Sequence, residues 1–225
     1  MRSQCIRISG HYALPLPPKK VLTVTVVSCN VRYMSQRRDE LTARSLDYLL
    51  RHGVAGLSLR PLAAEIGTSA RLLVYHFGSK EGLVTAAMDE LRRRLQESFG
   101  QMMARPGKTR KKDVIRTFWD WTLHPKNVPH MRLLFEVQVL AVQSPDKYAR
   151  YLEGTSSSWL DLIETSLPPS TEKQIVATLC VAVIDGLLLE YLSTGDKVRT
   201  TKALEVFDRI LDLKLRQRRR SGPTS

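Results

Sequence analysis

Apolar side chains recur every three or four residues along most of the chain, the spacing that gives an α-helix one buried face. The segments with this spacing are 37–52, 58–66, 69–76, 80–103, 113–123, 129–140, 145–163, 175–192 and 200–215. Proline, glycine or charged residues lie between them, so each segment predicts a separate helix. The pattern therefore predicts an all-α fold with about nine helices.

Residues 58–66 predict a short helix that ends at a tight turn. Its apolar face consists of Leu59, Leu62, Ala63 and Ile66. Ser58 is a candidate N-cap, because a serine hydroxyl accepts a hydrogen bond from an unpaired amide of the first turn. Gly67 supplies the positive φ that ends a helix, and Thr68 or Ser69 is expected to cap the next one.

A second short helix follows over residues 69–76. Leu73 and Phe77 are expected to be buried, while the other side of the helix faces outward. Gly78 ends it, and Ser79 caps a much longer helix that starts near Lys80. Two helices joined by a short turn, the second with a polar face, form a helix-turn-helix.

This region resembles the DNA-binding domain of TetR-family transcriptional repressors. The resemblance rests on the sequence Leu73-Val74-Tyr75-His76-Phe77-Gly78-Ser79-Lys80-Glu81-Gly82-Leu83 and covers roughly residues 37–90. The rest of the chain is similar only in helical architecture and length. One position departs from the pattern: the family commonly has a tyrosine, which often contacts a phosphate, where this chain has Val74. Either Tyr75 replaces it, or the contacts with DNA differ from those usual in the family.

The resemblance implies the domain organisation and the partners. A helix-turn-helix DNA-binding domain spans residues 34–90, and an effector-binding and dimerisation domain spans 91–215. Helices at about 171–194 and 200–215 are expected to form the interface of a homodimer. A dimer would set two recognition helices about 34–36 Å apart on a palindromic operator in double-stranded DNA. Repression of transcription is the usual activity of the family.

The candidate DNA-binding residues surround the second helix. They are Ser58, Arg60, Thr68, Ser69, Ala70, Arg71, Tyr75, His76 and Lys80. Arg71 is the candidate for a base edge, because its guanidinium fits O6 and N7 of guanine; the alternative is a solvated surface arginine. Tyr75, His76, Ser58 and Lys80 are candidates for phosphate contacts, and the alternative for His76 is packing within the domain.

A pocket for an unknown small-molecule effector is expected among the aromatic and methionine side chains of the second domain. The candidates are Met103, Phe118, Trp119, Trp121, Met131, Phe135, Gln138 and Trp159. Apolar walls with a few polar groups are typical of such pockets. The alternative is that these residues are plain core, since aromatic residues at helical spacing usually are.

The net charge of +13 is concentrated outside the predicted recognition helix. Residues 1–34, 105–112 and 214–225 each carry five basic residues and no acidic one. These runs would strengthen salt-dependent, non-specific attraction to DNA, or serve only as solvated segments. A non-specific DNA-binding protein that uses basic tails is therefore the alternative function.

Other classes of protein lack support in the sequence. There is no Gly-rich phosphate loop, no Cys/His metal spacing and no Gly-x-Ser-x-Gly motif, so a helical enzyme is the less favoured alternative and no cofactor or metal is expected. Cys5, Cys29 and Cys180 indicate a reducing, cytoplasmic setting. No apolar run was expected to reach the ~18 residues of a membrane helix.

The two ends of the chain differ from the rest. Pro15, Pro17 and Pro18 interrupt any helix, and residues 21–27 are the one β-like run. Because composition changes abruptly at Met34, residues 1–33 are interpreted as a disordered arm or a mis-assigned extension; a signal peptide is the disfavoured alternative. Residues 216–225 are interpreted as a disordered basic tail.

Overall fold

The computed structural model describes residues 19–103, 114–155, 158–167 and 172–220. Within these ranges every regular element is a helix, which confirms the all-α prediction. There are ten α-helices and one short 3-10 helix in the described ranges, against about nine expected. The difference arises in residues 145–163, where one helix was expected. The structure has η2 (Pro145–Tyr148), α7 (Ala149–Thr155) and α8 (Ser158–Ser166) there.

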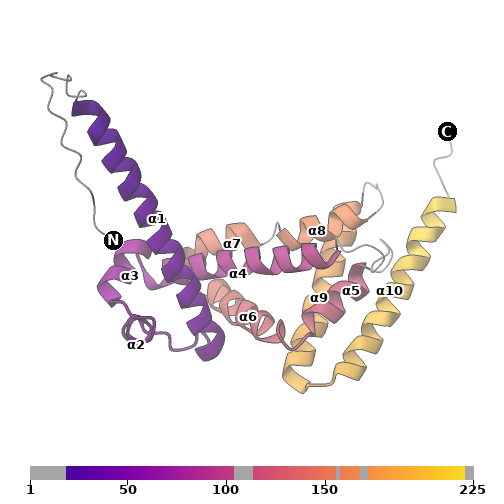
Figure 1. Cartoon of the computed structure of the whole chain (residues 1–225). Coiled ribbons are helices and arrows are strands. Elements are labelled where there is room, and N and C mark those ends of the chain that lie inside the picture. Colours follow the sequence, from indigo (N-terminus) through magenta and orange to yellow (C-terminus); the bar gives the residue numbers. More distant parts are fainter. Residues whose placement is uncertain (1–18, 104–113, 156–157, 168–171, 221–225) are drawn as a thin grey trace, which may run out of the picture. The chain divides into compact units, whose positions relative to one another are not determined.

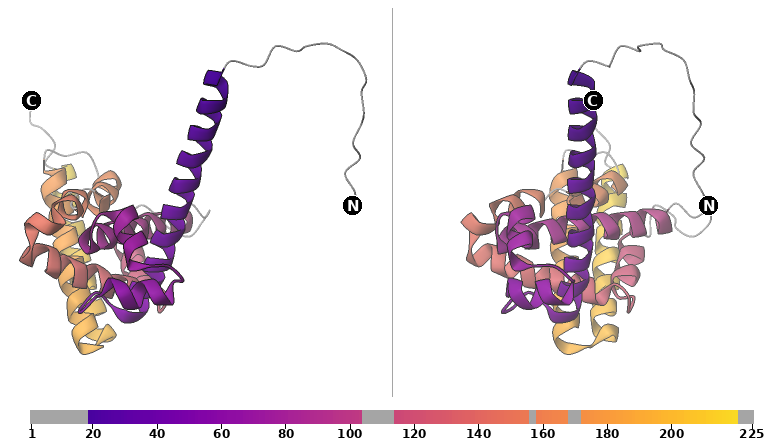
Figure 2. Two further views of the ribbon diagram at one scale, coloured as in Figure 1. Left: turned by 90° about the vertical axis from the view of Figure 1, so that its left-hand side faces the viewer. Right: turned by 60° about the vertical axis from the view of Figure 1, so that its left-hand side comes forward.

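Helix α1 (Lys19–His52) is one continuous helix of 34 residues (Figures 1 and 2). It begins well before Arg37, where the sequence placed its start, and it includes the β-like run 21–27. Propensity explains the error: valine and threonine cost only tenths of a kcal/mol per residue in a helix, about 0.7 at most. Extending a helix that already exists also requires no new nucleation. Residues 1–18 lie outside the described part of the chain.

The chain divides into two units, residues 1–40 and 41–225. The described part of the first unit is the N-terminal part of α1, where Arg37 Nη1 lies 2.6 Å from Glu40 Oε2. All other helices belong to the second unit.

The second unit begins with a small three-helix arrangement. Helices α2 (Leu59–Glu65) and α3 (Ala70–Phe77) pack with the end of α1 and the start of α4 around one apolar cluster. The buried members are Leu41, Leu62, Ala63, Ile66, Leu73, Phe77 and Leu83. Polar contacts reinforce the packing: Arg44 Nη1 donates to the Ile66 carbonyl oxygen at 3.0 Å, and Arg51 pairs with Glu65 at 2.6 Å. Helix α1 thus braces the two short helices.

Helix α4 (Lys80–Met103) connects this arrangement to a second, larger core. Its first turn is capped by Ser79, whose Oγ accepts a hydrogen bond from the Gly82 amide at 2.9 Å. Leu83 belongs to the small cluster, whereas Leu91, Leu95 and Phe99 belong to the larger one. One rigid element therefore contributes to both cores.

The larger core is built by the end of α1, through Leu46 and Leu49, by α4 and by the helices that follow it. These are α5 (Val114–Thr122), α6 (Val128–Gln143), α7, α8, α9 (Lys173–Thr194) and α10 (Lys197–Arg220). Trp119 is fully buried in this core, and its Nε1 donates to Thr201 Oγ1 on α10 at 3.0 Å.

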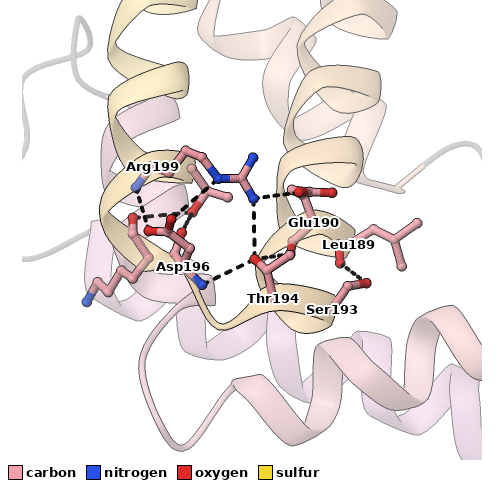
Figure 3. Close-up of polar contacts among 8 residues, drawn as sticks. Leu189, Glu190, Ser193, Thr194, Asp196 and Arg199 are labelled. Carbon is pink, nitrogen blue, oxygen red and sulfur yellow. Dashed lines mark hydrogen bonds and ion pairs between the residues drawn. The ribbon is translucent and has the colours of Figure 1, made fainter.

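Helices α9 and α10 form an antiparallel hairpin (Figures 1 and 2). Gly195, with φ of 72°, ends α9, and Asp196 caps α10 by accepting from the Arg199 amide at 2.9 Å. The Arg199 guanidinium also reaches back to Glu190 on α9, as Figure 3 shows. The two helices are therefore fixed together at the turn.

Helix α9 has the length and composition of a membrane span, with a mean hydropathy of 2.1 over eighteen residues. This corrects the expectation that no apolar run reaches that length. The helix packs against α8 and α10 and places Ala177, Cys180, Ile184 and Leu188 in the core. A core helix of a globular domain meets the same criterion, but only 22% of this window is buried within the single chain.

Candidate nucleic-acid interface and ligand cavity

The turn between α2 and α3 has the geometry that the sequence predicts. Gly67 has φ of 72°, and Ser69 caps α3 by accepting from the Leu72 amide at 3.1 Å. Thr68 does not cap it: its hydroxyl oxygen is buried and has no hydrogen-bond partner in the described residues. Ser58 stands at the N-cap position of α2, but its side chain makes no capping hydrogen bond. The expected cap is wrong there, and the exposed Ser58 hydroxyl stays open to other contacts.

Helix α3 separates its buried and exposed faces clearly. Leu73 and Phe77 are buried, whereas Arg71 and Tyr75 are exposed, Tyr75 by 69%. The unusual residue Val74 is also exposed. An apolar side chain therefore occupies surface on the helix expected to meet DNA.

The remaining candidates lie around this face. Ser58, Arg60, Ser69 and Lys80 are exposed, and Ala70 is half-buried at the first turn of α3. His76 is half-buried and meets the Tyr75 ring edge-on at 5.3 Å. That position is compatible with both readings of His76, a phosphate contact and packing. All nine candidates lie in α2, in α3, in the turn between them, or next to these two helices, where Ser58 precedes α2 and Lys80 begins α4.

A cavity of about 550 Å³ lies among the helices of the larger core. Helices α4 to α9 all contribute to its walls. The lining residues are Arg92, Phe118, Thr122, Met131, Leu134, Phe135, Gln138, Tyr151, Leu160, Ile163, Thr178, Val181, Ala182, Ile184, Asp185 and Leu188. This volume and this predominantly apolar wall are within the range of small-molecule sites.

The cavity brings together four of the eight candidates named from the sequence: Phe118, Met131, Phe135 and Gln138. The others are elsewhere. Trp119 is buried against α10, and Trp121 packs in the core against Phe99 at a ring distance of 5.4 Å. Met103 packs half-buried on the core without lining the cavity. The Trp159 side chain lies outside the described part of the structure.

Sequence analysis missed the two charged residues of the cavity. Arg92 belongs to a run of three arginines, a pattern typical of a solvated face, yet it is only 8% exposed. Its spacing to Met88, Leu95 and Phe99 puts it on the buried face of α4, and that spacing was a usable signal. Asp185 stands alone among apolar residues in α9, which was a signal of the same kind.

Burial shifts the acid–base behaviour of two groups on α9. It raises the pKa of Asp185 to about 6, although the side chain keeps contact with solvent. It also raises the pKa of the Cys180 thiol to about 11, which makes this thiol unreactive at neutral pH. Cys180 therefore acts as a small apolar core residue, while Asp185 stays mostly ionised above pH 6.

A braced helix-turn-helix followed by a helical domain is the architecture of a DNA-binding regulator. Residues 42–87 match the family model described as bacterial regulatory proteins of the tetR family. This match confirms the resemblance of the helix-turn-helix region to TetR-family transcriptional regulators. In the described residues, no group of three or more His, Cys, Asp or Glu side chains could hold a metal ion.

The fold is similar to that of known regulators over most of the chain. The HTH-type transcriptional regulator BetI of Stenotrophomonas maltophilia is 22% identical over 183 residues, which cover 80% of this chain and 93% of BetI. A putative TetR-family regulator from Rhodococcus sp. has a TM-score of 0.61 at 22% identity, covering 76% of this chain and 98% of its own. The multidrug binding protein EbrR, complexed with proflavin, has a TM-score of 0.55 at 25% identity, covering 77% of this chain and 98% of EbrR.

Proposed function

We propose that this chain is a cytoplasmic transcriptional repressor that binds a palindromic operator as a homodimer and is released when a small molecule occupies the cavity. The observation that carries the proposal is the exposed face of α3. Arg71 and Tyr75 are exposed on a helix whose other side is held in the core by Leu73 and Phe77. A firmly packed second helix with an exposed polar face is what major-groove reading requires.

The proposed contacts divide by chemistry. Arg71 reads a base edge, with Ser69 and Ala70 near it at the start of α3. The exposed side chains of Ser58, Arg60, Tyr75 and Lys80 contact phosphates and so fix the register without reading sequence. The first turn of α4, where Lys80 is exposed, adds backbone amides that favour a phosphate.

Dimerisation is supported by apolar residues exposed along the α9–α10 hairpin. On α9 the exposed positions Ile175, Leu179, Ala182, Gly186 and Leu189 are spaced by four, three, four and three residues. On α10 the exposed positions Ala203, Val206, Ile210 and Leu213 have the same kind of spacing. A seam of this period is buried when helices pack side by side, as in a four-helix interface between two copies.

Ligand control is supported by the cavity and by the complex of EbrR with proflavin. A ligand releases DNA only if it binds the DNA-incompetent conformation more tightly. The cavity is suited to such an effect because α4 contributes to both regions. Its residue Arg92 lines the cavity, and its residue Leu83 packs in the small apolar cluster with α2 and α3.

DNA binding is tested with a labelled fragment from immediately upstream of the gene, by fluorescence anisotropy at two salt concentrations with random DNA as competitor. Arg71→Ala is expected to weaken specific binding about 5- to 150-fold, the equivalent of about 1–3 kcal/mol for a bidentate base contact. Arg150→Ala, a change of an exposed arginine on α7, is the matched control and should bind as wild type.

The alternative is non-specific binding through the basic runs at 1–34, 105–112 and 214–225. In that case random DNA would compete fully, the salt dependence would be steep, and Arg71→Ala would match Arg150→Ala. Equal behaviour of the two variants on several upstream fragments would refute the sequence-specific function.

A further inference from the structure

The walls of the cavity are unequal in their polar content. Aromatic rings come from three different helices: Phe118 from α5, Phe135 from α6 and Tyr151 from α7. Leu160, Ile163 and Leu188 add aliphatic surface. Only two of the described lining residues carry a full charge near neutral pH, Arg92 and Asp185. The ligand class therefore depends on which of these charges is already neutralised.

The charge of Arg92 is compensated within the protein. Its Nη2 donates to Asp89 Oδ1 at 3.1 Å, and its guanidinium lies over the Tyr151 ring, 5.1 Å from the centroid. The Nη1 end packs against Gly154, where an added Cβ would come within 2.8 Å. An anion, a π face and a close backbone thus hold this guanidinium in place. Its Nε has no partner in the described residues, and one neutral acceptor would satisfy it.

The charge of Asp185 is not compensated. Asp185 has no ion pair or hydrogen bond in the described part of the chain, and burial is the one cause that raises its pKa. Arg92, the other charged group of the cavity, contributes nothing to that shift, so the two charges act independently. The side chain is exposed, yet the apolar atoms packed around its carboxylate raise its pKa, so the ionised form without a counter-ion is disfavoured there. A cation that enters beside it would relieve this cost.

We propose that the cavity takes an amphipathic organic cation, with its charge beside the Asp185 carboxylate and its apolar body against Phe118, Phe135 and Tyr151. The proposal rests on the proposed function, in that the cavity is the effector site. Both parts of the wall favour this class. Aromatic faces attract cations, and the volume of about 550 Å³ accommodates a body of several rings.

The test compares two probes of nearly the same shape and opposite charge, tetraphenylphosphonium and tetraphenylborate, by isothermal titration calorimetry on the full chain. Tetraphenylphosphonium is expected to bind at least tenfold more tightly than tetraphenylborate. Asp185→Asn should reduce its affinity about tenfold, equivalent to about 1.4 kcal/mol, while Asp185→Glu should retain most of it. Asp146→Asn, at an exposed position in η2, is the matched control and should bind as wild type.

Three outcomes would overturn the proposal. The first is tighter binding of tetraphenylborate than of tetraphenylphosphonium, with that binding lost in Arg92→Gln. The second is an Asp185→Asn variant that binds tetraphenylphosphonium as tightly as wild type does. The third is that neither probe binds. Arg71-dependent DNA binding is measured on the same wild-type preparation. If the protein binds DNA through Arg71 but binds no cation, the proposed ligand class is wrong and the proposed regulator function stands. If it binds the cation but not DNA, the proposed DNA-binding function is wrong and the ligand class stands.

Discussion

The carboxylate of Glu136 accepts a hydrogen bond from the backbone amide of Val54, with 2.9 Å between Oε2 and the nitrogen. Val54 is in the turn after α1 and Glu136 is on α6, 82 residues further along the chain. Phe135 and Gln138, near Glu136 on the same helix, line the cavity. This hydrogen bond therefore links a wall of the cavity to the turn that precedes the helix-turn-helix.

Gly53 makes this approach of Glu136 possible. A Cβ at position 53 would lie 2.8 Å from Glu136 Oε2, and Gly53 also has φ of 73°. Gly56 has nearly the same φ, 71°, but a Cβ there would meet no atom within 4 Å. The two glycines therefore separate the cost of positive φ from the cost of displacing Glu136.

We expect Gly56→Ala to lower the free energy of unfolding by about 1–2 kcal/mol, the cost of a left-handed backbone with a side chain. Gly53→Ala should cost about 1–3 kcal/mol more, because Glu136 must move away and leave the Val54 amide unpaired. Urea denaturation of the two variants measures the difference. Equal losses would show that the Glu136 contact adds nothing to stability.

A second prediction concerns signal transmission through the same hydrogen bond. Glu136→Ala should reduce the ratio of DNA dissociation constants measured with and without a cavity ligand, because α6 loses its link to the turn after α1. Allosteric coupling of about 1–3 kcal/mol is usual between two sites, so a several-fold fall in the ratio is expected. Anisotropy titrations with and without tetraphenylphosphonium measure it.

The control for this prediction is Glu153→Ala, which removes an exposed carboxylate from α7 without a described contact to the DNA-binding helices. It should keep the wild-type ratio. If Glu136→Ala also keeps that ratio while it still binds DNA and ligand, transmission does not use this hydrogen bond.

Local sequence signals predicted the DNA-binding region in detail. Gly67, Ser69, Gly78 and Ser79 act on their own turns, so their effects are encoded within a few residues. The cap expected at Ser58 was wrong because side-chain rotation, not sequence type, decides whether a capping hydrogen bond is made. The predicted start of α1 was wrong because the preference of residues 21–27 for a β-strand is weak. Extending a helix that already exists costs little by comparison.

The cavity could be predicted only in part. Phe118, Met131, Phe135 and Gln138 were identified by type, but Trp119 and Trp121 have the same type and lie in the core. Which aromatic residue lines a cavity depends on contacts between helices far apart in sequence, such as the one between Trp119 and Thr201. Arg92 was missed because a charged residue suggests an exposed face unless its position in the helical period is considered. Asp185 is exposed, and its place at the cavity depends on how α9 packs against other helices.

The proposed dimer predicts a sharp difference between two substitutions of exposed apolar residues. Leu179, on the α9 seam, is 51% exposed, and Val142, on α6 outside the seam, is 66% exposed. Leu179→Glu should produce a monomer, because a carboxylate buried in an apolar interface without a partner costs several kcal/mol, or about 100-fold or more in dimer affinity. Val142→Glu should remain a dimer. Sedimentation velocity measures both, and a monomeric wild type would contradict the seam.

The raised pKa of Asp185 predicts a dependence of stability on pH. The group takes up its proton near pH 6 in the folded chain, against an ordinary value of 3.8. Between these values the folded state binds more protons than the unfolded state, so the free energy of unfolding falls as pH rises from about 4 to 6 and stays lowered above that. Asp185→Asn removes this loss. The variant should therefore be more stable than wild type at pH 7.5 and equal to it near pH 4.

Because the carboxyl keeps contact with solvent, only part of the pKa shift is expected to act on stability, about 1 kcal/mol. That corresponds to a rise of roughly 2–4 °C in Tm for a chain of this size. Thermal unfolding of wild type, Asp185→Asn and Asp146→Asn across this range measures the effect. If the difference in stability between wild type and Asp185→Asn does not change with pH, the difference arises from packing, because the two proteins differ in ionisation only at this carboxyl.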